Sequence, residues 1–255
     1  MKIKLFFINM LLLLCGIVDA QAKTQIIAHR GHWDKRSSPE NSLSSLENAI
    51  KTGAYGSELD VRMSSDGVLV LNHDEKYKGV FIEKATYKEI SKLRLANGEP
   101  LPTLQQCADI VKKQKKTKLI IEIKPHSSAE KDRRTAGEIV KLVNKNNIAD
   151  LVDYISFSWH ACKELIKLNP GHRVSYLRGD KPPKQLKAEG LWGMAYSWKE
   201  LKEKHPEWLK EAKALGLVVN VWTVNDAKIM RYFIGQKVDF ITTDKPLVLK
   251  ELLKK

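Results

Sequence analysis

The sequence is poor in cysteine and in aromatic residues, and its one long apolar run lies at the N-terminus. Three cysteines in 255 residues are too few for a fold held by disulfides, so a hydrophobic core must supply the stability. Charged residues make up 29% of the chain and apolar residues 43%, which excludes a disordered chain and a polytopic membrane protein. Because no repeat, low-complexity linker or change in composition divides the chain, we expect a single domain.

Acidic residues are in the minority, with 30 Asp and Glu against 44 Lys and Arg, and the formal net charge is +14. An excess of this size favours an anionic partner: a nucleic acid, an acidic membrane surface or a phosphorylated substrate. The sequence contains no nucleic-acid recognition motif. We therefore expect a small anionic substrate, no nucleic acid and no protein partner, with peripheral proximity to a membrane left open.

The N-terminal segment has the three parts of a secretory signal. Lys2 and Lys4 precede an apolar stretch over residues 5–18, and Ala20-Gln21-Ala22 provides the small residues of a cleavage site. The stretch is short for a transmembrane helix, which needs about 20 apolar residues. We therefore predict a signal peptide over residues 1–22 and export, most simply to the periplasm.

Two alternatives to simple cleavage remain. Lipidation of Cys15 would anchor the chain, although Leu14 stands where a small residue is wanted, and an uncleaved segment would act as a membrane anchor. We place the mature domain at residues 23–255, which is most of the chain. Export would also bring Cys107 and Cys162 into an oxidising compartment, where a disulfide between them is conceivable but is not indicated by the sequence.

Short β-rich runs alternate with amphipathic helical patterns from Gln25 onward. The predicted strands are Ile26–His29, Glu58–Arg62, Val68–Asn72, Leu119–Lys124, Tyr154–Phe157, Arg173–Leu177, Gly193–Tyr196, Leu217–Thr223 and Phe240–Thr243. Apolar spacings of three and four predict helices over Leu43–Thr52, Leu104–Gln114, Thr135–Asn146, Ala161–Leu168, Lys199–Leu215 and Ala227–Ile234. This alternation is typical of a mostly parallel sheet covered by helices.

One pair of strands breaks the alternation. Only residues 63–67 separate the second run from the third, which is too short for a crossover helix, and Asp66-Gly67 is a hairpin signal. With Asp66-Gly67 as a two-residue turn, Asp60 would lie opposite His73. The other eight strands predict a single closed (β/α)8 barrel, or TIM barrel, with a β-hairpin after its second strand and the active site at the carboxyl ends of the strands.

Carboxylates gather at the ends of two predicted strands. Glu58 and Asp60 are two residues apart, and so are Glu122 and Lys124, so strand alternation turns each pair to one face. Inward-facing carboxylates in a barrel mouth need a positive partner. Three carboxylates without a nearby cysteine suit Mg²⁺ or Ca²⁺ better than Zn²⁺, so we predict a site for one divalent cation at Glu58, Asp60 and Glu122.

Two histidines and two cations are expected at the same rim. His29 and His73 can divide proton transfers, one accepting from the nucleophile and the other donating to the leaving group. Arg30 and Lys124 supply fixed positive charge against phosphate oxygens. Together with a metal, these groups are suited to the hydrolysis of a phosphodiester.

Nine short motifs resemble, in order, those of the glycerophosphodiester phosphodiesterases. They span residues 27–246 and are His29-Arg30-Gly31, Pro39-Glu40-Asn41-Ser42, Glu58-Leu59-Asp60-Val61, Asp66-Gly67, His73-Asp74, Leu101-Pro102-Thr103-Leu104, Glu122-Ile123-Lys124, Val221-Trp222-Thr223-Val224-Asn225 and Thr243-Asp244-Lys245-Pro246. The resemblance implies a TIM-barrel enzyme that uses a divalent metal to hydrolyse deacylated phospholipids to glycerol 3-phosphate and an alcohol. The site residues that it implies are catalytic His29 and His73, metal-binding Glu58, Asp60 and Glu122, and substrate-binding Arg30, Lys124 and Trp222.

The sequence departs from many members of this family in one respect. Those members carry an inserted subdomain after the His-Asp motif, whereas residues 75–100 leave room for only a small insertion. A smaller cover over the site would admit bulkier alcohols. Two alternatives stay open: a lysophospholipase D-like enzyme that acts on intact lysolipid, and a barrel whose site has decayed so that it binds phosphoesters without catalysis.

Several residues also have simpler structural interpretations. Lys124 could serve as a counter-ion to Glu122, and Trp222 could pack inside the barrel. Asn41 follows the first strand, where capping of the next helix by Asn41 or Ser42 is the default expectation. The remaining histidines are expected at the surface, with His126 nearest to the site: His32, His126, His160, His172 and His205.

Overall fold

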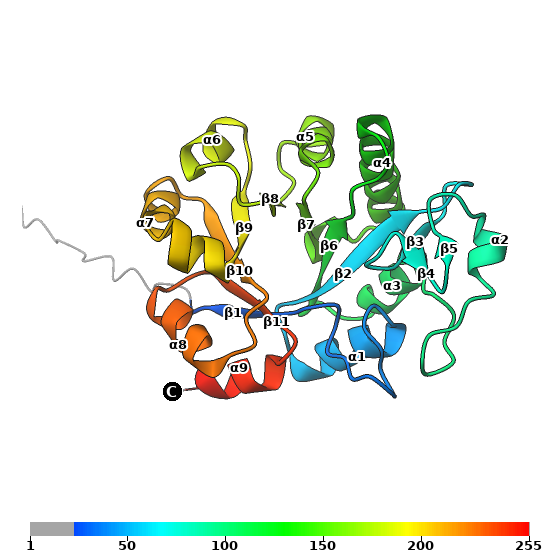
Figure 1. Cartoon of the computed structure of the whole chain (residues 1–255), viewed down its shortest axis with the longest axis horizontal. Helices are drawn as coiled ribbons and strands as arrows, with labels where there is room; N and C mark the ends of the chain where they lie inside the picture. The colour runs from blue at the N-terminus through cyan, green and yellow to red at the C-terminus, as the bar shows by residue number, and fades with distance from the viewer. Residues whose placement is uncertain (1–22, 255) are drawn as a thin grey trace, which may run out of the picture.

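A computed structural model of the chain describes residues 23–254, in which eight parallel strands close into a barrel (Figure 1). The barrel strands in spatial order are β1 (Gln25–Ala28), β2 (Gly56–Met63), β6 (Lys118–Ile123), β7 (Val152–Ser156), β8 (Val174–Tyr176), β9 (Gly193–Ser197), β10 (Val218–Trp222) and β11 (Phe240–Thr243). Pairing of β1 with both β2 and β11 closes the ring. The predicted TIM barrel is confirmed. The expected signal peptide and Cys15 lie outside the described residues.

Helices cover the outside of the barrel and connect successive strands. They are α1 (Leu43–Thr52), α3 (Leu104–Val111), α4 (Ala129–Lys145), α5 (Trp159–Leu168), α6 (Pro183–Ala188), α7 (Glu207–Ala214), α8 (Ala227–Gly235) and α9 (Pro246–Leu252), with short helical turns η1 (Ala149–Leu151) and η2 (Glu200–Lys204). The helix predicted over Lys199–Leu215 is wrong as one element. It is divided between η2 and α7 because Pro206 has no N–H to donate and its ring clashes with a preceding turn.

Strand alternation sorts the side chains of β2 and β6 between the helices and the barrel interior. Leu59, Val61 and Met63 point outward into the main apolar cluster, together with the odd-numbered residues 119, 121 and 123 of β6. The even-numbered residues face inward. A second apolar cluster fills part of the interior and contains Ile27, Ile120, Ile155, Leu177, Ala195 and Phe240. The inward-facing polar residues of β2 and β6 lie next to this apolar cluster, at the carboxyl end of the barrel.

The hairpin after β2 exists, but its register differs by one residue from the prediction. β3 (Leu69–Leu71) pairs with β2 in antiparallel fashion, with Val61 opposite Leu71, and the Asn72 N–H donates to the Asp60 carbonyl at 3.0 Å. The turn contains three residues rather than two, since Gly67 takes a left-handed φ of 88° and adds a position to the loop. Asp60 therefore lies beside Asn72, and His73 follows the end of the hairpin.

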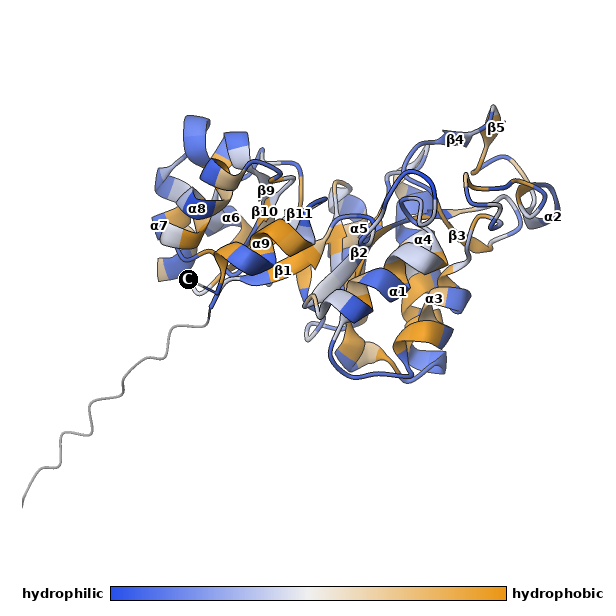
Figure 2. Ribbon diagram, turned by 90° about the horizontal axis from the view of Figure 1, so that it is seen from below, coloured by the Kyte–Doolittle hydropathy of each residue, from blue (hydrophilic) through white to orange (hydrophobic). Residues whose placement is uncertain are grey.

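Residues 75–100 form a small excursion beyond the hairpin. It contains the two-stranded ribbon of β4 (Lys76–Tyr77) and β5 (Val80–Phe81) and the short helix α2 (Tyr87–Ile90). In Figure 2 the ribbon stands out from the body of the protein beyond β3. A separate apolar cluster of Val70, Ile82, Ala85, Ile90, Leu95 and Leu101 supports it. The prediction of a small insertion agrees with this excursion.

Two further properties concern the described part of the chain. Within residues 23–254, no helix combines the length and the apolar character needed to cross a membrane. Cys107 in α3 and Cys162 in α5 are both buried free thiols, so the disulfide that export would permit is absent between them. Burial raises the pKa of each thiol to about 12, which leaves both of them protonated and unreactive at neutral pH.

Candidate active site at the carboxyl ends of the strands

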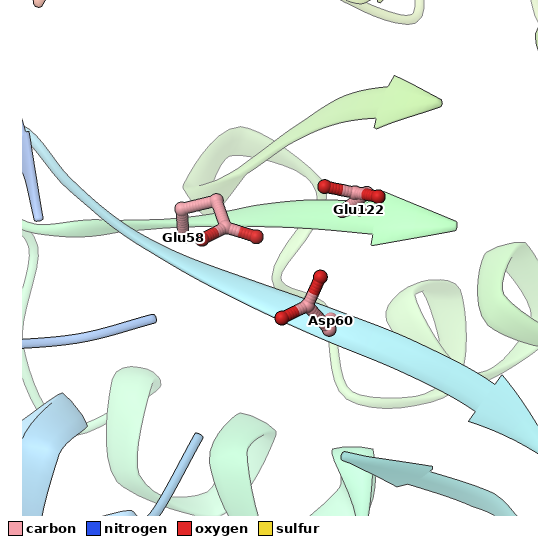
Figure 3. Close-up of side chains that lie close together, drawn as sticks. All are labelled: Glu58, Asp60 and Glu122. Carbon is pink, nitrogen blue, oxygen red and sulfur yellow. The ribbon is translucent and has the colours of Figure 1, made fainter. Parts of the chain in front are cut away.

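Three carboxylates from two adjacent strands meet inside the barrel (Figure 3). Glu58 and Asp60 come from β2 and Glu122 from β6, where it is the register partner of Asp60. One oxygen of each lies within 4.8 Å of the others, and the three residues are 2%, 1% and 8% exposed. The structure thus brings together the residues that the sequence predicts as metal ligands.

A tight turn after β1 supplies the first contact to this cluster. Arg30 has a left-handed φ of 55°, and its backbone N–H donates to Glu58 Oε2 at 2.8 Å. Gly31 follows with a φ of 87°, and a Cβ there would lie 2.3 Å from Ser45 Oγ, so the turn needs glycine. The local chain after β1 is therefore shaped to present a backbone donor to Glu58.

Asn41 holds Asp60 through two hydrogen bonds. Its side-chain amide donates to Asp60 Oδ2 at 2.8 Å, and its side-chain oxygen accepts from the Asp60 N–H at 2.9 Å. Ser42 is the cap of α1, since its hydroxyl accepts from the Ser45 N–H at 3.0 Å. Of the two candidate caps, Asn41 is thus not the cap. Its role in the site was missed because only the tertiary fold brings Asp60 to it.

Two cations face the carboxylates. Lys124 Nζ lies 2.7 Å from Glu122 Oε1 and 3.2 Å from Asp60 Oδ1, and Arg30 Nε lies 3.4 Å from Asp60 Oδ2. Burial alone would lower the pKa of Lys124, but Glu122 and Asp60 raise it, so the ammonium stays charged. Burial would raise the pKa of Asp60, which Lys124 and the hydrogen bond from Asn41 instead lower.

Glu58 and Glu122 carry negative charge that the protein does not fully balance. Burial, and then the charges of Asp60 and Glu122, raise the pKa of Glu58 well above its usual value. Burial and Asp60 likewise raise the pKa of Glu122 against the opposite effect of Lys124. Glu58 Oε1 is buried and accepts no hydrogen bond from any described residue. A buried carboxylate oxygen with no donor fits a divalent cation as its missing partner, because hard cations bind carboxylate oxygens.

His29 lies at the rim beside this cluster. It follows β1 directly, Asp244 follows β11 directly, and the preceding residues of the two strands are register partners. His29 Nδ1 lies 2.7 Å from Asp244 Oδ1, which also accepts from Trp33 Nε1 at 3.3 Å. Asn225 Nδ2 donates to Asp244 Oδ2 at 2.6 Å. The carboxylate therefore fixes the imidazole by Nδ1 and leaves Nε2 for chemistry.

His73 is held in a similar way. Its Nδ1 lies 2.7 Å from Asp74 Oδ1. The side chain of Arg62 donates to the His73 carbonyl from Nε at 3.2 Å and from Nη2 at 2.9 Å, and its Nη1 donates to the Pro125 carbonyl at 3.3 Å. Burial lowers the pKa of His73 despite the charge of Asp60. Arg62 thus joins the loops that carry His73 and Lys124, a role for which the sequence offers no signal.

A cavity of about 130 Å³ opens between these groups. The polar part of its wall contains His29, Arg30, Glu58, His73, Glu122 and Lys124, so the predicted catalytic and phosphate-binding residues share one space. The rest is largely apolar and includes Phe157, Leu177 and Trp222. The rings of Phe157 and Trp222 meet edge to face with centroids 5.6 Å apart, and Trp222 Nε1 donates to the Ala195 carbonyl at 2.6 Å. Trp222 therefore both packs in the barrel and lines the cavity.

Of the histidines expected at the surface, His126 contradicts the expectation. Its side chain is fully buried, Nε2 accepts from the Met63 N–H at 3.2 Å, and Nδ1 lies 3.4 Å from Asp132 Oδ1. It links the end of β2 to the start of α4 outside the cavity. His160 is exposed, whereas the other three expected surface histidines are partly buried: His32, His172 and His205.

Comparison with known proteins identifies the family. Residues 29–248 match the model of the Glycerophosphoryl diester phosphodiesterase family. The chain belongs to this family. A glycerophosphodiester phosphodiesterase of Caldanaerobacter subterraneus subsp. tengcongensis is 30% identical to this chain, over 91% of this chain and 99% of that protein.

Solved structures agree with this membership. A glycerophosphodiester phosphodiesterase from Parabacteroides distasonis is 46% identical to this phosphodiesterase, with a TM-score of 0.89, covering 92% of this chain and 98% of the other. A phosphodiesterase from Oleispira antarctica, solved in complex with the product sn-glycerol-3-phosphate, has the same fold, with 24% identity, a TM-score of 0.81 and coverage of 91% and 98%. The prediction of an enzyme that hydrolyses glycerophosphodiesters is confirmed at the level of the family.

Proposed function

We propose that this phosphodiesterase cleaves glycerophosphodiesters to glycerol 3-phosphate and an alcohol with the help of one divalent cation, Mg²⁺ or Ca²⁺. Glu58, Asp60 and Glu122 would hold the cation. The observation that carries this proposal is the buried carboxylate cluster, with the unpartnered Glu58 Oε1, in the wall of the same cavity as two histidines. A divalent cation supplies electrophilic stabilisation of the phosphate and offsets its charge.

His29 and His73 carry the proton transfers in this proposal. Both imidazoles have Nδ1 within 2.7 Å of an aspartate oxygen, and both line the cavity, so each can present Nε2 to the substrate. One accepts the proton of the attacking oxygen as the bond to phosphorus forms. The other donates a proton to the alcohol oxygen as its bond to phosphorus breaks.

Arg30 and Lys124 would bind the phosphate oxygens. Lys124 is buried against two carboxylates, and this geometry keeps its ammonium charged and fixed in position at the cavity wall. Fixed positive charge stabilises the negative charge that builds up on phosphate oxygens in the transition state. Trp222 and Phe157 form the apolar side of the cavity, against which the carbon skeleton of glycerol or of the alcohol would pack.

The proposal is tested with purified enzyme and a panel of glycerophosphodiesters that differ in the alcohol, each assayed with Mg²⁺, Ca²⁺ and a chelator. We expect release of glycerol 3-phosphate with either metal and loss of activity in chelator. Full activity in excess chelator would remove the metal from the proposal. Hydrolysis of lysophosphatidylcholine without activity on glycerophosphocholine would instead support the lysophospholipase D-like alternative. Export through residues 1–22, most simply to the periplasm, is part of the proposal and is tested by fractionation of cells.

A further inference from the structure

Large apolar side chains are rarely exposed in the described residues, and those that are exposed lie at two ends of the barrel. Within residues 23–254, four large hydrophobic residues are exposed: Phe81 by 37%, Leu168 by 46%, Leu247 by 52% and Val248 by 42%. Single exposed apolar residues are ordinary on a protein surface. Three of these residues, however, lie on segments that leave the same end of the barrel.

Phe81, Leu247 and Val248 lie on segments that leave the catalytic end of the barrel. Leu247 and Val248 are in the first turn of α9, which begins two residues after the Asp244 that holds His29. Phe81 is in the excursion that begins directly after His73 and Asp74. The segments follow β11 and the β2–β3 hairpin, and β1 lies between β11 and β2 in the ring. Leu168 ends α5 and lies at the opposite end, because each helix runs from the carboxyl ends of the strands back to the amino ends.

Lysines accompany Phe81. Lys76 Nζ lies 4.1 Å and Lys84 Nζ 4.9 Å from the centroid of the Phe81 ring, and Lys78 is exposed in the turn of the ribbon. Further exposed lysines follow on and after α2, at positions 88 and 92. The excursion therefore presents an aromatic ring among ammonium groups, as at the interface between water and lipid headgroups.

The acidic residues of the excursion only partly offset this charge: Glu75 and Glu89 are exposed, whereas Glu83 and Glu99 are partly buried, and the exposed lysines outnumber the exposed glutamates. Glu83 pairs with Lys131 and accepts from the Ser127 N–H at 3.0 Å. Glu89 accepts from the Thr86 N–H at 2.8 Å, and Glu99 accepts from the Leu43 N–H at 3.1 Å. The exposed charge of the excursion is therefore predominantly positive.

The α9 side of the rim has a similar combination of groups. A surface groove of about 480 Å³ extends from Trp33 and Leu247, near the rim, along α1 and α9 to Lys51 and Lys250, and it also contains Asp34. Trp33 belongs to the loop after β1, and Lys245 is exposed at the start of α9. The start of α9 thus combines exposed aliphatic side chains with a lysine, and Trp33 lies beside Leu247 in the groove.

We propose that the catalytic rim, through Phe81 with its lysines and through the start of α9 with Trp33, docks on an anionic lipid bilayer. Charge complementarity identifies the partner, because both segments combine exposed apolar side chains with lysines and because the chain as a whole has a net charge of +14. The proposal goes beyond hydrolysis and does not depend on it. Docking in this orientation would turn the mouth of the cavity toward the membrane surface.

The test is flotation of purified protein beginning at Lys23, which contains every element of the barrel, with lipid vesicles. We expect binding to phosphatidylcholine vesicles that contain phosphatidylglycerol, and little binding to phosphatidylcholine alone. Phe81→Asp and the double variant Leu247→Asp/Val248→Asp should each weaken binding about tenfold or more, because each removes an apolar side chain that would insert into the lipid and adds a repelled charge. Leu168→Asp is the matched control and should bind as the unmodified protein does.

A second pair of variants separates the position of the charge from its amount. Lys76→Glu/Lys78→Glu should weaken binding to anionic vesicles about tenfold. Lys141→Glu/Lys145→Glu makes the same change in net charge on the second half of α4, toward the opposite end of the barrel, and should have a much smaller effect. Equal losses from the two pairs would overturn the proposal in favour of nonspecific attraction, and so would tighter binding to soluble heparin than to vesicles. Hydrolysis of a soluble glycerophosphodiester is measured for every variant and should not change, so that failure of docking and failure of the proposed catalysis are distinguishable.

Discussion

His29 Nδ1 lies 2.7 Å from Asp244 Oδ1. The two residues directly follow β1 and β11, the first and last strands of the barrel, whose final residues are register partners. The contact fixes both the orientation and the tautomer of the imidazole. We therefore expect Asp244→Asn to lower kcat about 100-fold, with a smaller effect on KM, because the amide can orient the ring but can stabilise the wrong tautomer. Steady-state kinetics across pH should show an altered profile. Asp150→Asn, at an exposed position far along the chain, is the control, and an unchanged profile for Asp244→Asn would contradict the role.

The histidines themselves should have larger effects. Removal of a general acid or base costs about 10²- to 10⁴-fold in rate, so His29→Ala and His73→Ala should each lower kcat by that amount. Exposed His160 provides the control as His160→Ala, which should retain full activity. A near-normal rate for either of the first two variants would show that the two histidines do not share the proton transfers.

Glu58→Gln separates metal binding from folding. The amide relieves the repulsion among three buried carboxylates, so the metal-free variant should melt at the same temperature as the unmodified protein or higher. It should also lose most of the increase in melting temperature that Mg²⁺ or Ca²⁺ gives the unmodified protein, because it lacks a charged ligand. Thermal melts with chelator and with each cation provide the measurement. An undiminished increase with cation would place the metal elsewhere.

Asn41 should matter for both stability and activity. Asn41→Ala removes two hydrogen bonds to Asp60 and leaves a buried N–H and a carboxylate oxygen with fewer partners. We expect a loss of about 2 kcal/mol or more in the free energy of unfolding, measured with urea. Asn144→Ala, at an exposed position of α4, should change it little. Turnover of Asn41→Ala under conditions where it stays folded should also fall, since Asp60 is then free to move away from Glu122.

The attachment of the excursion should depend on acid. Burial tends to raise the pKa of Glu83, but hydrogen bonds from Lys131 and Ser127 lower it to about 2, below its ordinary value of 4.5. A depressed folded pKa means that the contribution to stability is complete above the unfolded pKa of 4.5 and is lost as the pH falls toward 2. Hydrogen exchange of residues 75–100 should therefore accelerate, relative to the barrel strands, as the pH falls through this range. Glu83→Gln should show the faster exchange already at pH 7; equal protection in that variant would contradict the attachment.

The sequence predicts the barrel because its evidence is local and repeated. Each strand shows its own alternation or apolar run, and a parallel barrel follows from their number and from the helices between them. The short helices α6 and α9 were missed: each has a proline in its first turn, and neither is long enough to show a clear apolar period. The register of the hairpin depended on the φ of Gly67, which composition does not reveal.

The candidate site was predicted in part. Spacing by two placed Glu58, Asp60 and Glu122 on inward faces, and the structure brings them together. The supporting contacts could not be found in this way. Asp244 and His29 are in contact but lie at opposite ends of the barrel in the sequence. Arg62 donates to a backbone carbonyl, that of His73. Neither contact produces a local pattern in the sequence.

The excursion over residues 75–100 rests on its own small apolar cluster, separate from the one between the barrel and its helices. A segment with its own core can open without the barrel opening, as a local unit of low stability. It can also be exchanged for a longer or shorter segment while the strands that carry the carboxylates stay unchanged. The barrel would then be the constant part of a modular enzyme, and transplanting this one segment between relatives would exchange the structure that follows His73 and Asp74 without changing the carboxylates.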